Sequence, residues 1–378
     1  MNRRDALLAT LSAAAVVPAL RASAATQAIA TPSVTSVDPA KYPKAWEVQR
    51  STVVVDGLDP SAINEKYLEM LQAGGVNCWH QSVGGLGFFA NLLTFLDQHA
   101  DKIVQVGTVR EIRAAKEQGK IGHLSGWQMA DPLIMDANGE APLQNLRAYR
   151  QLGLRIASIA YNNSNIFGGG CLDPDVPLTR LGKKYVEAVH SHRIVLDVCG
   201  HTGERTSFDA IQVSKGSGVP IICSHTNARA LNDNPRNISD RLIEAIAGTG
   251  GVIGLTSVSD FFMRSPKDEN VKASPQATMD KFFEHFDHLK KLVGVDHIGL
   301  GPDFMTGRVD LDAMGMDRER WPADVYSDWP WYMVKGFETI VELPKVTQGL
   351  LDRGWSAADV RKVLGENWLR VYEKVWGA

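Results

Sequence analysis

The chain has 378 residues, of which 44% are hydrophobic and 22% are charged, a composition typical of a soluble globular protein with one large or two ordinary domains. Its formal net charge of −3 argues against nucleic acid as a partner, because proteins that bind nucleic acid through their overall charge are strongly basic. The four cysteines have no C-x-x-C spacing and lie in apolar segments, so we expect buried thiols rather than disulfides.

The N-terminus predicts an export signal. Arg3 and Arg4 precede an apolar run at residues 6–20, and small residues follow at 22–25. This pattern predicts a signal peptide over residues 1–25, and the arginine pair favours the twin-arginine (Tat) machinery, which exports folded proteins. An uncleaved membrane anchor is the alternative, although the run is short for a membrane span. We therefore expect a periplasmic or otherwise exported protein, with a flexible leader at 26–45 and one domain at 46–378.

From about residue 50 onward, short apolar runs alternate with amphipathic segments. Strands are predicted at residues 52–55, 76–80, 103–106, 121–125, 156–160, 194–198, 221–223, 252–255 and 297–300. Helical patterns are predicted at residues 62–72, 108–118, 143–152, 179–190 and 241–247, with two more helices in 354–377. This repetition predicts an α/β protein with a (β/α)8 TIM barrel. The alternative, a doubly wound open sheet, would favour a glycine-rich first turn.

The sequence VVVDGLDP, residues 53–60, spans the end of the first predicted strand. Its apolar residues predict a buried strand, and Asp56 and Gly57 predict the turn that ends it. Many barrel enzymes place metal ligands at this point, but the segment holds no histidine.

Three other strands are followed by residues that bind metals. His201 follows the run at 194–198, His225 follows 221–223, and Asp303 follows 297–300. Because the carboxyl ends of barrel strands meet at one face, these side chains are predicted to converge on a metal site, for which imidazole and carboxylate suit zinc. The alternative is that each histidine only caps a strand. Arg236, near a predicted helix start, would either clamp a substrate carboxylate or form a surface ion pair with Asp233 or Asp240.

Several segments together resemble the renal (membrane) dipeptidase family, also called peptidase family M19. They are YNNSNIFGGGCLDPDVPLTRLG, HTGERTSFDAI, PIICSHTNARALNDNPRNISDRLIEAIAGTGGVIGL, HIGLGPDF and GENWLRVY. The resemblance covers about residues 50–375, and the block containing SHTNARAL and PRNISD is its most specific part.

The resemblance implies a metal-dependent amidohydrolase barrel that hydrolyses dipeptides at a two-zinc centre. It implies that His201 and His225 hold one zinc ion, that Asp303 handles protons and that Arg236 binds the substrate carboxylate. Tyr161 stands where the family often has a substrate-binding histidine. A homodimer is left open, because family members often dimerise.

Three ligands of that two-metal centre are absent from this sequence. Where the family has D-G-H-x-D on the first strand, this chain has Leu58 and Pro60 at the two ligand positions. The bridging glutamate aligns with Gln128, a neutral amide that we expect to contact substrate instead. We therefore expect one zinc ion rather than two, with Asp303 as a general base.

Three functions remain open on these grounds. The first is a dipeptidase-like metallohydrolase acting on dipeptides or small peptide-like amides. The second is a non-hydrolytic periplasmic enzyme on the same fold, such as a tautomerase, epimerase or lyase. The third is a catalytically silent binding protein. The fold alone does not decide among them.

Overall fold

The computed structural model describes residues 37–135, 143–264, 276–308 and 317–377. The predicted signal peptide and residues 26–36 of the predicted leader lie outside this part of the chain. Helix α1, at Pro43–Ser51, starts slightly before the domain boundary expected at residue 46. Within the described residues, we find no helix with both the length and the apolar character that a membrane span requires.

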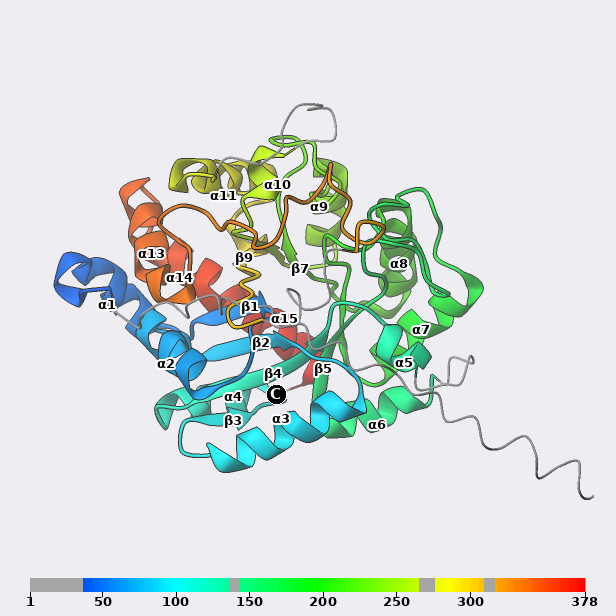
Figure 1. The fold of residues 1–378 in the computed structure, drawn as a ribbon, viewed down its shortest axis with the longest axis horizontal. Coiled ribbons are helices and arrows are strands. Elements are labelled where there is room, and N and C mark those ends of the chain that lie inside the picture. The colour runs from blue at the N-terminus through cyan, green and yellow to red at the C-terminus, as the bar shows by residue number, and fades with distance from the viewer. Residues whose placement is uncertain (1–36, 136–142, 265–275, 309–316, 378) are drawn as a thin grey trace, which may run out of the picture. The chain divides into compact units, whose positions relative to one another are not determined.

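Figure 1 shows the described helices arranged around a ring of parallel strands. The strands are β1 Val55–Asp59, β2 Cys78–Ser82, β3 Ile103–Gln105, β4 Ile121–Trp127, β5 Leu154–Ser158, β6 Val195–Asp197, β7 Cys223–Thr226, β8 Ile253–Leu255 and β9 Ile298–Leu300. The helices after α1 are α2 Glu65–Gly74, α3 Leu86–Gln98, α4 Val109–Glu117, α5 Asp131–Met135, α6 Asn145–Leu152, α7 Arg180–Ser191, α8 Glu204–Ser217, α9 Asp240–Ala247, α10 Asp260–Met263, α11 Met279–Val293, α13 Leu343–Asp352, α14 Ala357–Arg361 and α15 Asn367–Trp376.

Eight of these strands form the predicted TIM barrel. Parallel pairing runs in the order β1-β2-β4-β5-β6 and then β7-β8-β9, while β3 pairs only with the start of β4. A bridge between Asp197 and Ile222 joins the two sheets. The ring closes where the Asp303 backbone N–H donates to the carbonyl of Leu58 at 3.0 Å, beside β1. Closure at this point fixes the backbone of Asp303, the predicted catalytic residue.

The strands predicted at residues 52–55, 76–80, 156–160 and 221–223 have starts displaced by two or three residues, and two of these shifts change the interpretation. Strand β1 begins at Val55 and runs to Asp59, so Asp56 and Gly57 lie inside the strand and the predicted turn at these residues is wrong. All five residues of β1 are buried, which explains how acidic residues and a glycine stay extended there. His225 lies within β7 rather than after it.

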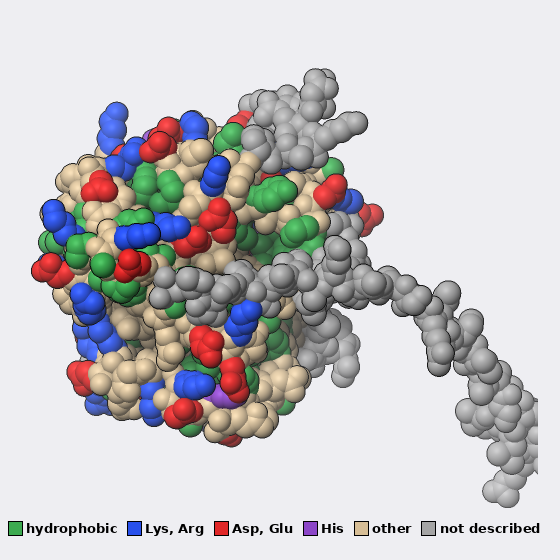
Figure 2. Space-filling view, turned by 60° about the vertical axis from the view of Figure 1, so that its left-hand side comes forward, with side chains coloured by type: hydrophobic (Ala, Val, Ile, Leu, Met, Phe, Trp, Pro, Cys, Tyr) green, Lys and Arg blue, Asp and Glu red, His purple; other side chains and the backbone are tan. Residues whose placement is uncertain are grey.

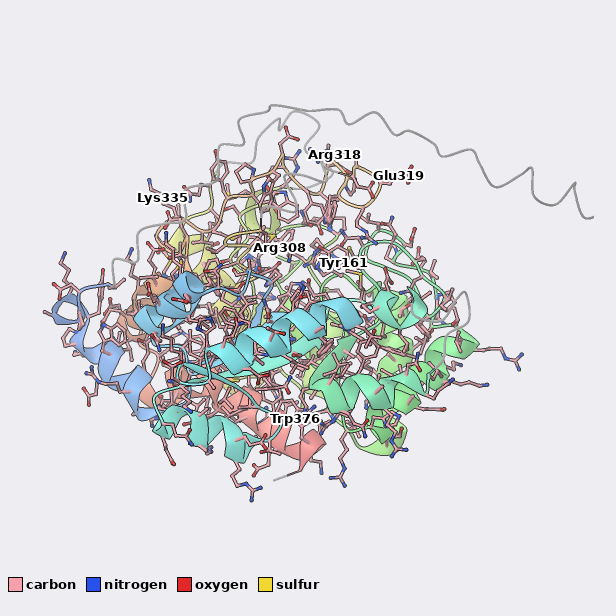
Figure 3. All side chains as sticks on the ribbon, turned by 60° about the horizontal axis from the view of Figure 1, so that its bottom comes forward. Tyr161, Arg308, Arg318, Glu319, Lys335 and Trp376 are labelled. Carbon is pink, nitrogen blue, oxygen red and sulfur yellow. The ribbon has the colours of Figure 1, made fainter. Side chains whose placement is uncertain are left out.

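The amino-terminal end of the barrel is closed by α15. Its Trp368 is fully buried in a cluster with the barrel residues Val55 and Leu124. The indole occupies space left by glycines: a Cβ at Gly57 or Gly299 would lie 2.5 Å from it. Figure 3 shows Trp376 of α15 at one end of the barrel and Tyr161 and Arg308 at the other.

Local sequence signals determine where the helices begin and end. Helices α4, α7 and α9 each begin at a hydroxyl side chain that accepts a hydrogen bond from the backbone N–H of the third helical residue: Thr108, Thr179 and Ser239. Gly75 and Gly153 end α2 and α6 in the left-handed conformation.

All four cysteines are free and buried, as predicted. Figure 2 shows acidic and basic side chains interspersed over one face, in line with the small net charge.

We predict that Trp368 is a principal source of stability. Trp368→Ala should lower the free energy of unfolding by about 3–5 kcal/mol, because the cavity it leaves is lined by backbone that cannot collapse. Trp368→Phe should cost less. Urea unfolding followed by circular dichroism measures the change, and Tyr332→Ala, at a side chain that is 56% exposed, is the control. Equal effects of Trp368→Ala and Tyr332→Ala would contradict the assignment.

A second prediction concerns Asp59, a fully buried carboxyl group in β1. Burial raises its pKa from 3.8 to about 7, although the Ser61 backbone and the Tyr67 hydroxyl donate to it. Ionising it in the folded state therefore costs stability, and this cost grows as the pH rises from about 4 to about 7. Asp59→Asn should be the more stable protein at pH 8, by on the order of 2 kcal/mol, and the difference should shrink toward pH 4.

Urea unfolding of both proteins from pH 4 to pH 8 provides the measurement. Asp97→Asn, at an exposed position of α3, is the matched control and should show no such pH dependence relative to the wild type. A difference between Asp59→Asn and the wild type that stays constant with pH would refute the burial argument.

Candidate functional site

The predicted site residues converge at the carboxyl end of the barrel. Five of the six line one cavity of about 270 Å³: Gln128, Tyr161, His201, Arg236 and Asp303. They follow β4, β5, β6, β7 and β9, so residues far apart in sequence meet because their strands are neighbours in the ring. The sixth, His225, is fully buried directly behind this group, with its Nε2 atom 3.3 Å from Gln128 Nε2 and 4.0 Å from Asp303 Oδ2.

Hydrogen bonds determine how the His225 ring is oriented. The Ser224 hydroxyl donates to Asp197 Oδ2 at 2.6 Å and lies 2.8 Å from His225 Nδ1. Because the only hydroxyl hydrogen goes to the carboxylate, His225 Nδ1 must be the donor to Ser224. The Nε2 atom therefore carries a lone pair, directed toward Gln128 and Asp303.

His201 is held in a similar way from the other side of the cavity. Its Nδ1 atom lies 2.7 Å from Asn162 Oδ1, which leaves Nε2 for the cavity. The Tyr161 ring stacks on the imidazole with centroids 3.7 Å apart. The centroids of the His201 and His225 rings are 5.0 Å apart. Burial first, and then the charge of Arg236, lower the pKa of both histidines, so both rings are neutral as metal ligands must be.

This arrangement fits one divalent metal ion. His201 and His225 offer two neutral imidazoles whose ring centroids are 5.0 Å apart, and His225 Nε2 lies near Asp303 and Gln128; zinc prefers nitrogen and oxygen ligands of this kind. A second ion finds no side-chain ligand at Leu58, which is buried and apolar, or at Pro60, which has no side-chain donor atom. The Asp59 carboxyl group already accepts hydrogen bonds from Tyr67 and Ser61.

His225 also belongs to a second group of potential metal ligands. Donor atoms of Asp197, Cys199 and His225 lie within 4.8 Å of one another. These atoms are already committed, since Ser224 bonds Asp197 and His225, and Ser158 lies 3.0 Å from Cys199 Sγ. The group therefore supports His225 rather than forming a site of its own.

Arg236 is the most unusual residue in the cavity. Its side chain is fully buried, and none of its three guanidinium nitrogens has a hydrogen-bond partner among the described residues. The ring of Phe261 lies 4.8 Å from the guanidinium carbon. The alternative interpretation as a surface ion pair is therefore wrong. A buried cation that faces a cavity with free donors is suited to bind an anion.

Asp303 lies opposite Arg236 with an unusual backbone. Its φ angle of 63° lies in the left-handed region, which non-glycine residues adopt mainly at functional or constrained positions. Burial raises its pKa to about 7, while Arg236 opposes the shift and Asp59 adds to it. The carboxyl group can therefore accept or release a proton near neutral pH.

The outer wall of the cavity is formed by residues 317–335, which we call the aromatic loop. Its Trp321, Tyr326 and Trp331 line the cavity together with Phe261 from α10. The loop is attached to the barrel by hydrogen bonds from the Ser327 hydroxyl and backbone to Asp260 Oδ2, both at 2.8 Å. The cavity is thus largely apolar around its few charged groups.

Sequence reasoning missed three residues that orient the histidines: Asn162, Asp197 and Ser224. Each is adjacent or close to a predicted site residue in the sequence, which was the only available signal. Their roles depend on contacts between neighbouring strands, and no spacing rule in one sequence reveals these.

Comparisons with known proteins point to one family. The family described as membrane dipeptidase (peptidase family M19) matches residues 91–316 and 327–377. A fungal relative, dipeptidase verJ of Clonostachys rogersoniana, is 26% identical over 75% of this chain and 62% of its own length. Another, dipeptidase tcpJ of Claviceps purpurea, is 25% identical over 75% of this chain. The chain spans about three-fifths of the length of these relatives, 62% and 58%.

Among solved structures, an amidohydrolase from Pseudomonas aeruginosa is 30% identical, with a TM-score of 0.76 over 88% of this chain and 99% of its own. A metallopeptidase from Rhodobacter sphaeroides, solved with a phosphinate mimic of the dipeptide L-Ala-D-Ala, shares the fold at 20% identity and a TM-score of 0.67, covering 86% of this chain and all of its own. The family match covers most of the chain and includes the segments that carry His201, His225, Arg236 and Asp303, so this protein belongs to the membrane dipeptidase family, peptidase family M19.

Proposed function

We propose that this protein is a metal-dependent, dipeptidase-like hydrolase that cleaves dipeptides or small peptide-like amides with one zinc ion. The observation that carries the proposal is Arg236, a buried guanidinium that has no hydrogen-bond partner among the described residues and lies in the same cavity as His201. A buried charge without a counter-ion is costly, so the site is expected to gain its missing anion from a ligand.

The substrate carboxylate is the proposed partner of Arg236. A guanidinium binds a carboxylate through two parallel hydrogen bonds, and all its donors are available here. The apolar wall formed by Phe261, Trp321 and Trp331 would exclude water and contact the rest of the substrate. The ligand is therefore expected to be small, with a free carboxylate and an apolar remainder.

His201 and His225 are the proposed zinc ligands, completed by Asp303, Gln128 or water. When bound, a zinc ion supplies Lewis acidity that polarises an amide carbonyl and acidifies water. The Asn162 and Ser224 contacts keep both Nε2 atoms unprotonated and directed at this position.

Asp303 is the proposed general base and proton carrier. With its pKa near 7, it can take a proton from the attacking water and return it to the departing amine. The Gln128 amide nitrogen lies 3.3 Å from His225 Nε2; with the Nε2 lone pair bound to zinc, the amide would be free to donate to a substrate carbonyl. The Tyr161 hydroxyl, 3.4 Å from Trp321 Nε1, is a further donor at the cavity wall.

Export by the Tat machinery to the periplasm is also proposed. It rests on Arg3, Arg4 and the apolar run that follows them. A Tat route suits a protein that must fold and acquire its metal before export. Replacing both arginines with lysine should leave the precursor in the cytoplasm, as cell fractionation would reveal; unchanged export would exclude this route.

We predict that purified wild-type protein binds about one zinc ion per chain, as a single site built on His201 and His225 implies. His201→Ala and His225→Ala should each lose most of this zinc, measured by elemental analysis. His288→Ala is the control, because that histidine pairs with Asp240 on the surface side of α11. Two zinc ions in the wild type, or unchanged zinc in both variants, would contradict the site.

We also predict opposite effects of Arg236→Met on activity and stability. Hydrolysis of a panel of dipeptides in the presence of zinc should fall about 100-fold or more in kcat/KM, since hydrogen bonds to a charged group are lost. Stability without substrate should stay the same or rise, because an unpaired buried charge is removed.

Arg229→Met provides the matched control for this experiment, since Arg229 pairs with Glu204 at 2.7 Å and does not line the catalytic cavity. It should change kcat/KM little. Wild-type protein with zinc bound and no activity on any dipeptide would argue against the proposed hydrolase.

A further inference from the structure

Asn162 lies between the His201 imidazole and the aromatic loop. Its side chain is fully buried just after β5, and its backbone is left-handed, with a φ angle of 57°. The backbone is also tied to His201, because the Asn162 N–H donates to the His201 carbonyl at 3.2 Å. The polar atoms of this one side chain contact both a proposed metal ligand and the wall of the substrate cavity.

The orientation of the Asn162 amide follows from its partners. The Arg320 carbonyl can only accept, and it lies 2.7 Å from Nδ2, so the NH2 group must face the aromatic loop. The Oδ1 atom then faces His201 Nδ1 at 2.7 Å, and because Oδ1 can only accept, Nδ1 carries the proton. The same Oδ1 accepts from the Tyr326 hydroxyl at 3.1 Å.

Two of these bonds reach the aromatic loop and one reaches His201. Arg320 is the neighbour of Trp321, and both Trp321 and Tyr326 line the cavity. A displacement of the loop would remove the Arg320 and Tyr326 bonds and leave the amide held only by His201 and by the weak Cys171 thiol donor, so that it could turn. A turned amide would direct its NH2 group at His201 Nδ1, and the hydrogen bond that fixes the His201 tautomer would be lost.

We propose that Asn162 is a positioning residue that couples the placement of the aromatic loop to zinc binding at His201. The inference rests on the proposed function. Zinc would hold His201 in the orientation that Asn162 stabilises, and Asn162 in that orientation holds the loop against the cavity. Because such coupling is reciprocal, groups that order the loop should tighten zinc binding by the same factor.

Three variants test separately the contact of Asn162 with His201 and its contact with the aromatic loop. Asn162→Gly removes the side chain and tolerates the left-handed backbone. Asn162→Asp keeps an acceptor for His201 and Tyr326 but cannot donate to the Arg320 carbonyl. Asn163→Ala is the matched control: the neighbouring Asn163 side chain is exposed and also bonds the loop, to the Glu319 carbonyl at 3.2 Å. It has no bond to His201.

Zinc affinity, measured by competition with a chelator, is the first readout. Asn162→Gly should weaken it about 10- to 100-fold, as loss of an outer-shell partner of a histidine ligand does. Asn162→Asp should retain most of the affinity, and Asn163→Ala should stay within about twofold of the wild type. Wild-type affinity in Asn162→Gly would overturn the proposal.

Hydrogen exchange of the aromatic loop with and without zinc is the second readout. Zinc should slow exchange in residues 317–335 of the wild type and of Asn163→Ala. It should not do so in Asn162→Gly or in Asn162→Asp, which binds zinc but has lost its bond to Arg320. Exchange that zinc leaves unchanged in the wild type would overturn the coupling.

The measurement distinguishes this inference from the proposed function. Zinc-dependent protection without hydrolysis of any dipeptide would support the coupling and refute the hydrolase. Dipeptide hydrolysis together with equal zinc affinity in wild type and Asn162→Gly would support the hydrolase and refute the coupling. A wild-type protein that binds no zinc would refute both.

Discussion

The site depends on a positive charge that the fold buries without a partner. Arg236 enters the barrel end because Gly200, before His201, has no side chain; a Cβ there would collide with the guanidinium. Its backbone N–H is held by Asn234 Oδ1 at 2.9 Å, and Phe261 faces the cation. The rest of the cavity is organised around this charge, which contributes to lowering the pKa of both histidines and opposes the upward shift at Asp303. A ligand anion would supply the counter-ion that Arg236 lacks among the described residues.

Much of this structure could be predicted from the sequence. Short apolar runs between amphipathic segments indicated every described strand, because buried parallel strands are apolar on both faces. The residues that follow those runs had to meet, since the strand ends of a barrel share one face. His201, Arg236 and Asp303 therefore line one cavity, with His225 just behind it.

The remaining features depend on contacts that no local pattern contains. Strand β1 continues through Asp56 and Gly57 because its neighbours bury it completely and Trp368 requires the glycine. Burial of Arg236 and the connection of Asn162 to the aromatic loop join segments that are distant in the chain. The tautomers of His201 and His225 follow from which partner atoms can only accept, and this requires the three-dimensional arrangement.

The residues that stand in place of the family's first-strand ligands have mostly uncharged neighbours. His80 fills the barrel interior between Gly57, whose carbonyl it bonds, and Gly126, where a Cβ would collide with its ring. Burial lowers the pKa of His80 to about 4, so the ring is neutral. Leu58, Pro60 and Gln128 are also uncharged, and Asp303 is the only acidic residue that lines the cavity within the part of the chain that the structure describes. The buried carboxyl groups of Asp56 and Asp59 have raised pKa values, so a second dication would find little compensating negative charge there, which is costly. The same replacements that remove its ligands therefore remove its electrostatic support, in line with the proposal of one zinc ion held by His201 and His225.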